Sequence, residues 1–191
     1  MGIGVYAGSF NPIHNVHLSI ANKLINDGIV EKVIFVPAGD GYNKKGLALG
    51  KHRFNMISKA IENNFNLEVS DVEIVNNKLY SYQTLDYFKE KYFDNEICFI
   101  MGSDNLQTFH TWKRYKYILE NYKLIVFLRN GQKREDFNEY LNYRNIVFVE
   151  YNVSLSASEI REDIKKNKYD EVKRKVHDKV FDYIKEFNLY E

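Results

Sequence analysis

The sequence has 191 residues, which is the length of one ordinary domain with a buried core. It carries 27 lysines and arginines against 26 aspartates and glutamates, so no overall charge draws the protein to nucleic acid or to an acidic membrane. A single cysteine excludes disulfide and cysteine–zinc frameworks, and no apolar run approaches the ~18 residues of a membrane span. We therefore expect a cytoplasmic protein with no nucleic-acid and no membrane partner.

Six short apolar runs rich in β-branched residues predict strands, at residues 3–7, 32–38, 67–74, 96–102, 123–129 and 145–150. Segments with helical spacing of apolar residues lie between them. This alternation predicts a doubly wound, Rossmann-like α/β fold with a parallel sheet.

From about residue 156 to residue 191 the chain has helical periodicity. One apolar stripe comprises Val176, Val180, Phe181, Ile184 and Phe187. We expect this C-terminal helical segment to dock on the main body. Because no linker-like composition interrupts the chain, residues 1–191 are expected to form a single domain.

The first strand-to-helix turn, GSFNPIHNVH, is the first candidate for a ligand site, since ligands bind at the carboxyl ends of parallel strands. Gly8 and Ser9 let a phosphate approach backbone amides, and the following helix directs its positive end at the same place. His14 and His17 share a helix face and can aim two ring donors at one point. The alternatives are that one histidine caps the helix while the other packs, or that the pair binds a metal.

Two loops after later strands add charged side chains. GYNKKG contains Lys44 and Lys45, which either contact an anion or belong to a solvated surface loop. In MGSDN, Asp104 follows a strand and either accepts hydrogen bonds from ribose hydroxyls or caps a helix.

Two further segments contain candidate binding residues. SASEIR begins a helix with a capping serine and places Arg161 one turn inside it, where an anion is favoured. Trp112, the only tryptophan, lies in a polar stretch and either packs in the core or stacks on a planar ring.

Together these segments resemble a nucleotidyltransferase of the H-x-G-H superfamily, and specifically the nicotinamide/nicotinate mononucleotide adenylyltransferases, over nearly the whole chain. GSFNPIHNVH resembles the first family motif, with Val16 in place of its glycine. GSDNLQTFHTW resembles the G-x-D segment and the tryptophan that follows it, and SASEIR resembles the closing I-S-S-T-x-I-R motif. GYNKKGLALGKHRFNM and SYQTL are similar to segments typical of pyridine-nucleotide members.

The resemblance implies adenylyl transfer from ATP to the 5′-phosphate of nicotinate or nicotinamide mononucleotide in NAD biosynthesis. Mg²⁺ would then be bound mainly by phosphate oxygens and water rather than by a cluster of protein ligands. The alternatives are transfer to another phosphate acceptor, such as phosphopantetheine, and a nucleotide-binding protein without catalysis. Whether the acid or the amide is preferred, and whether the protein forms a homo-oligomer, stays open.

The resemblance also implies roles for individual residues. The catalytic set is His14, His17 and Arg161. The ATP-binding set is Gly8, Ser9, Phe10, Gly102, Asp104, Ser158 and Arg161, with the leaving pyrophosphate held by Arg161 and Ser158. The set that binds the pyridine mononucleotide is Lys44, Lys45, Thr84 and Trp112.

Overall fold

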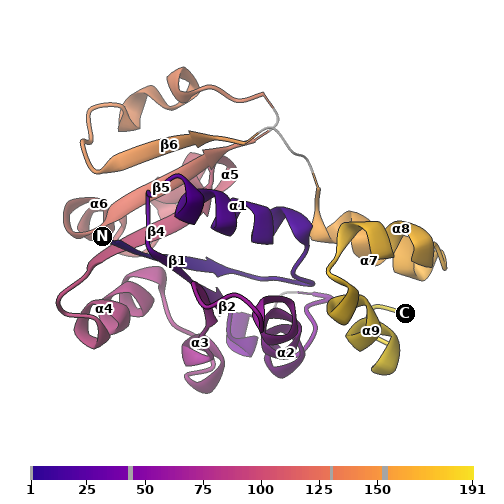
Figure 1. Ribbon diagram of the computed structural model, residues 1–191. Helices are drawn as coiled ribbons and strands as arrows, with labels where there is room; N and C mark the ends of the chain where they lie inside the picture. The colour runs from indigo at the N-terminus through magenta and orange to yellow at the C-terminus, as the bar shows by residue number, and fades with distance from the viewer. Residues whose placement is uncertain (1, 43–44, 130, 152–154) are drawn as a thin grey trace.

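The computed structural model describes residues 2–42, 45–129, 131–151 and 155–191. In these ranges six parallel strands form one sheet in the order β3-β2-β1-β4-β5-β6 (Figure 1). The strands are β1 (Gly2–Gly8), β2 (Lys32–Pro37), β3 (Leu67–Val69), β4 (Glu96–Gly102), β5 (Lys123–Leu128) and β6 (Ile146–Glu150). The predicted doubly wound α/β fold is confirmed, and its strand order reverses between β1 and β4.

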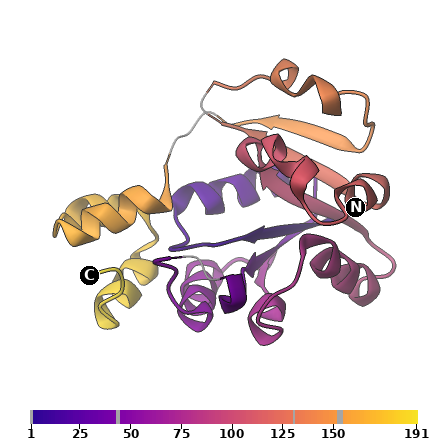
Figure 2. The same cartoon turned by 180° about the vertical axis from the view of Figure 1, so that it is seen from behind.

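Helices cover both faces of the sheet (Figures 1 and 2). One face carries α1 (Asn15–Asn26) and α2 (Gly50–Ile61). The other carries α3 (Val72–Val75), α4 (Ser81–Lys91), α5 (Ser103–Gln107), α6 (Tyr115–Asn121) and the 3₁₀ segments η2 (Phe109–Thr111) and η3 (Arg134–Tyr140). A further 3₁₀ turn, η1 (Asp40–Tyr42), follows β2.

The alternation of side chains along each strand produces two separate apolar clusters. In β1, Tyr6 belongs to the cluster under α1 and α2, whereas its neighbour Val5 belongs to the cluster under α4 and α6. Successive residues of a strand point to opposite faces, so both faces of a central strand are buried when helices cover both. This explains why the strands have continuous apolar runs.

The expected strand at residues 67–74 is wrong in its second half. β3 ends at Val69, and residues 72–75 form the short helix α3. The Asp71 carbonyl accepts hydrogen bonds from the amides of Ile74 and Val75, which closes a helical turn beyond the sheet edge. The apolar alternation of this segment resembles a strand, but the ladder between β3 and β2 ends at the Phe35–Val69 pair, although β2 itself continues to Pro37.

The C-terminal segment forms α7 (Ala157–Lys165), α8 (Tyr169–Lys175) and α9 (Asp178–Glu186), which lie beyond the carboxyl ends of the strands (Figure 1). Val180 and Ile184 are buried in the same cluster as side chains of α1 and α2. Phe187 is 44% exposed and contacts Tyr183, with ring centroids 4.5 Å apart. None of the helices in the described ranges combines the length and apolarity needed to cross a bilayer.

Candidate active site

The turn after β1 brings backbone amides to the carboxyl edge of the sheet. A Cβ at Gly8 would lie 3.2 Å from the Phe10 ring, a tight contact that favours glycine at this position. Phe10 has a positive φ of 43° and is buried, where its ring packs edge-on against Tyr6 and Phe35. The buried ring fixes the turn, and Ser9 and Phe10 line the cavity that opens above it.

His14 and His17 form a stacked pair at the start of α1. Their ring centroids are 3.7 Å apart, with 25° between the ring planes. The backbone N–H of His14 donates to Nδ1 of His17 at 3.3 Å. Since Nδ1 of a neutral His17 accepts, its Nε2 carries the ring proton. One nitrogen of His17 therefore caps the helix and leaves the other available as a donor.

Both histidines are neutral near pH 7. Burial, together with the positive charge of Arg129, lowers the pKa of His14 to about 3. Burial lowers the pKa of His17 well below its usual value, and His14 and Arg129 lower it further. Nδ1 of His14 is buried and has no hydrogen-bond partner among the described residues. The pair offers polar ring atoms to a ligand without adding a formal charge.

Arg161 on α7 reaches back to the turn after β1. Its Nη1 donates to the Asn11 carbonyl at 2.8 Å, and its Nη2 donates to Ser158 Oγ at 3.0 Å. The predicted capping serine of α7 is Ser156, whose Oγ accepts from the Glu159 amide. Arg161 and Ser158 thus lie at one helix start, where an anion is favoured.

Arg161 and the histidines line one cavity of about 240 Å³. Lys45 lies on its wall as well, beside Leu47. Asn11 links the walls, since its side chain donates to the Gly46 carbonyl and accepts from the Ala48 amide. Lys44 lies outside the described residues. Cationic and hydrogen-bonding groups from three distant parts of the chain therefore surround one space.

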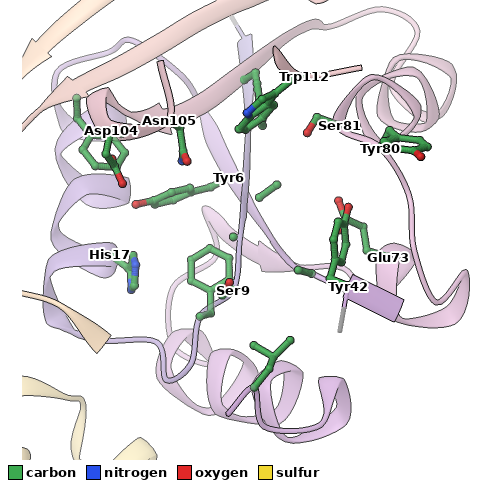
Figure 3. Close-up of a pocket in the computed structure, with 18 of the residues that line it drawn as sticks. Tyr6, Ser9, His17, Tyr42, Glu73, Tyr80, Ser81, Asp104, Asn105 and Trp112 are labelled. Carbon is green, nitrogen blue, oxygen red and sulfur yellow. The ribbon is translucent and has the colours of Figure 1, made fainter. Parts of the chain in front are cut away.

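A larger cavity of about 590 Å³ lies above the ends of β1 and β4 and contains two groups of side chains (Figure 3). The first group includes His17, Tyr6 and Asp104. A Cβ at Gly102 would fall 2.3 Å from Asp104 Oδ1, so a larger residue there would displace this carboxylate. Arg129 Nη1 lies 4.0 Å from the same carboxylate oxygen, and its guanidinium stacks on Phe127 at 4.7 Å.

The second group of this cavity is aromatic. Trp112 is half-buried, with its ring centroid 5.3 Å from that of Phe109 and 6.2 Å from that of Phe99, and it lines the cavity. Figure 3 shows Tyr42, Tyr80, Ser81 and Glu73 at this end, on the side away from His17. Lys113 also lines the cavity. Trp112 thus both packs on the core and faces the cavity.

Thr84, which the resemblance places in the mononucleotide-binding set, is not among the residues that line this cavity. It is 1% exposed, and its hydroxyl donates to Glu73 Oε1 at 2.7 Å. Thr84 lies one helical turn inside α4, and Ser81 at the helix start occupies the cavity wall instead. Thr84 thus contacts a residue of the cavity wall rather than the cavity itself.

Sequence reasoning missed three charged residues of the site. Glu73 lies in the segment expected to be a strand, and Arg129 is the last residue of the expected strand at 123–129. Arg53 is fully buried and donates to the carbonyls of Ser9, Ala38 and Ala48 and to Asp40 Oδ1. The sequence does contain one indication that Arg53 is buried. It precedes Met56 and Ile57 by three and four residues, which places it on the apolar face of α2.

No group of three or more histidine, cysteine, aspartate or glutamate side chains suited to holding a metal ion occurs in the part of the chain that the structure describes. The site is instead rich in hydrogen-bond donors, from the turn after β1, α7 and Arg129. Such an arrangement suits an anionic ligand with several phosphate groups.

Comparisons with known proteins agree with this geometry. A sequence model of the cytidylyltransferase-like family matches residues 5–163. A probable nicotinate-nucleotide adenylyltransferase of Clostridium acetobutylicum is 35% identical over 97% of both chains. A protein of Fusobacterium nucleatum with the same description is 38% identical over 89% of this chain and 90% of its own.

The fold is also similar to a solved structure. The Plasmodium falciparum nicotinic acid mononucleotide adenylyltransferase complexed with NaAD superposes with a TM-score of 0.85 and 24% identity, covering 99% of this chain and 97% of that one. This likeness concerns the fold. From the family model and the curated relatives, the chain belongs to the cytidylyltransferase-like family and, within it, to the nicotinate-nucleotide adenylyltransferases, which are nucleotidyltransferase enzymes.

Proposed function

We propose that this protein transfers the adenylyl group of ATP to the 5′-phosphate of a pyridine mononucleotide, giving the dinucleotide and pyrophosphate. A phosphate oxygen of the acceptor attacks the α-phosphorus, and the bond between the α-phosphorus and the bridging oxygen of pyrophosphate breaks. The attacking phosphate is already ionised near pH 7, so the reaction needs positioning and charge stabilisation rather than a general base.

The observation that carries the proposal is the neutral, stacked pair of His14 and His17 in the same cavity as Arg161. The histidines donate to the α-phosphate oxygens as negative charge develops there. Arg161 and Ser158 hold the departing pyrophosphate, for which two adjacent donors at a helix start are suited. The amides of Ser9 and Phe10 beside Gly8 complete the phosphate site.

The two ends of the larger cavity suit the two nucleosides. Asp104, beside Gly102, accepts hydrogen bonds from the adenosine ribose, as acidic residues do in related sheet folds. Trp112 stacks on the pyridine ring at the other end. Lys45 contacts the phosphate of the mononucleotide, supported by its position between the turn after β1 and α7. Lys44 stays a candidate for the same role.

Mg²⁺ would accompany ATP in this proposal and would be held mainly by phosphate oxygens and water. When bound, the ion neutralises part of the phosphate charge. We also propose that the chain works as one domain in the cytoplasm, without nucleic acid. The near-neutral net charge supports the absence of a nucleic-acid partner, and the buried free thiol of Cys98 supports a reducing compartment.

Pyrophosphate release from ATP and Mg²⁺ tests the proposal across a panel of acceptors: nicotinate mononucleotide, nicotinamide mononucleotide, phosphopantetheine and glycerol phosphate. We expect release with a pyridine mononucleotide and none with the other two. Release with phosphopantetheine but with neither mononucleotide would assign the protein to another reaction of the same type.

A further inference from the structure

The aromatic end of the large cavity contains a buried carboxyl group that the mechanism does not use. Glu73 on α3 is 4% exposed and lines the cavity with Trp112 and Ser81 (Figure 3). Within the described ranges no ion pair involves Glu73. The nearby Arg53 guanidinium pairs with Asp40 instead, at 2.9 Å. A carboxyl group buried without a cation is costly unless hydrogen bonds or a proton stabilise it.

Several groups hold Glu73 in place. The Thr84 hydroxyl donates to Oε1 at 2.7 Å, and the Gly39 amide and the Tyr42 hydroxyl lie close enough to lower the pKa of the carboxyl group. A side chain at Gly39 would lie 2.3 Å from the Glu73 carbonyl, so the backbones of the loop after β2 and of α3 are in close contact. The hydrogen bond from Thr84 and the close approach of the loop after β2 therefore hold Glu73 at the cavity wall.

We infer that Glu73 is the specificity-determining residue of the acceptor site, and that its carboxyl group contacts the pyridine substituent and distinguishes a carboxylate from a carboxamide. The inference rests on the proposed function, which places the pyridine ring against Trp112. Carboxylate and carboxamide have almost the same shape, so a pocket separates them through charge and hydrogen-bond donors rather than through size.

The protonation state of Glu73 decides which substituent it favours. A protonated Glu73 donates its O–H to the carboxylate of nicotinate, whereas an ionised Glu73 repels that carboxylate. An ionised Glu73 accepts a hydrogen bond from the N–H of nicotinamide. The acid substrate is thus favoured by protonation and the amide substrate by ionisation.

Both states are populated near neutral pH. Burial raises the pKa of Glu73 to about 7, against the lowering effect of its hydrogen bonds from Thr84, Gly39 and Tyr42 and of the Arg53 charge. Lys113, the lysine that lines the same end of the cavity, lies over the Tyr80 ring with Nζ 4.4 Å from its centroid. As pH rises through about 7, Glu73 loses its proton, and the preference moves from nicotinate to nicotinamide.

The test is the ratio of kcat/KM for nicotinate mononucleotide to that for nicotinamide mononucleotide, measured from about pH 6 to about pH 8.5. We expect the wild-type ratio to fall by about tenfold or more over this range, since the protonated fraction falls tenfold per pH unit above the pKa. Glu73→Gln is neutral at every pH, so its ratio should not change with pH. A carboxyl group with a purely structural role would alter both acceptors together and leave the ratio unchanged.

Two further variants sharpen the result. Thr84→Val removes the hydrogen bond that favours the ionised form of Glu73, so the pH at which the ratio changes should rise. Asp71→Asn makes the same charge change two residues away on an exposed side chain, and should keep the wild-type profile. If both acceptors react but the wild-type ratio is flat, or Glu73→Gln keeps the wild-type profile, the inference is wrong. If neither mononucleotide reacts, the proposed function itself fails.

Discussion

The His14 backbone N–H donates to Nδ1 of His17, and the two rings are stacked with centroids 3.7 Å apart. This hydrogen bond fixes the tautomer of His17, so its proton is on the nitrogen that does not cap the helix. The same ring therefore stabilises the start of α1 and supplies a donor. Sequence reasoning treated capping and phosphate binding as alternatives, whereas the geometry is compatible with both at once.

His17→Ala is expected to lower kcat by about 10²-fold or more, the scale found on removing a donor that acts on transition-state charge. The cause is the loss of the Nε2 donor, and KM for either substrate should change much less. His110→Ala, an exposed histidine outside both cavities, is the control and should keep wild-type turnover. A kcat near the wild-type value in His17→Ala would show that His17 caps the helix and has no role in catalysis.

Arg161→Ala is expected to raise KM for ATP about tenfold or more, because a hydrogen bond to a charged group contributes about 1.5–3 kcal/mol. KM for the mononucleotide should move far less, since Arg161 is assigned to the leaving pyrophosphate. Arg174→Ala removes an arginine whose side chain is 74% exposed on α8 and serves as the control. An unchanged dependence of the rate on ATP concentration would contradict the assignment.

Trp112→Ala is expected to raise KM for nicotinate and nicotinamide mononucleotides by similar factors, about tenfold if stacking contributes about 1–1.5 kcal/mol. The dependence on ATP should barely change. Because Trp112 also packs against Phe109 and Phe99, the variant should unfold at a lower denaturant concentration as well. Steady-state kinetics at a temperature where the variant is folded separates the two effects. Unchanged acceptor KM with reduced stability would make Trp112 a core residue.

His14 also makes the free energy of unfolding depend on pH. Its pKa is lowered to about 3 in the folded protein, whereas an unfolded histidine has a pKa of about 6.5. Between these values the unfolded state binds the extra proton, so stability falls as pH falls, by at most about 1.4 kcal/mol per pH unit. Urea unfolding at several pH values measures this slope.

The matched comparison for this slope is His14→Asn, which removes the titrating ring. Its stability should depend less steeply on pH than that of the wild type between about pH 6.5 and pH 4. Glu73 contributes with the opposite sign, because its raised pKa removes stability as pH rises toward 7, but this contribution is common to both proteins. Equal slopes in the two proteins would show that His14 is not protected from protonation by the fold.

Several features of this protein follow from local sequence alone. The alternation of apolar runs and helical segments predicts the doubly wound sheet, since each strand and helix is recognised from neighbouring residues. The turn at Gly8 and the capped start of α7 at Ser156 are likewise local, because the close contact of Gly8 with Phe10 and a helix cap each depend on a few adjacent residues. His14, His17 and Arg161 were identified from such segments.

The tertiary structure alone decided how these segments meet and what their side chains do. Arg161 contacts the carbonyl of Asn11 across 150 positions of sequence, and Arg53 joins three loops from a buried helix face. The Thr84 hydroxyl donates to Glu73. Glu73 lies on α3, in a segment whose apolar alternation predicts a strand, whereas the strand ends at Val69. Contacts between distant segments, and the burial that shifts a pKa, are set by how the whole chain packs, so no window of neighbouring residues contains them.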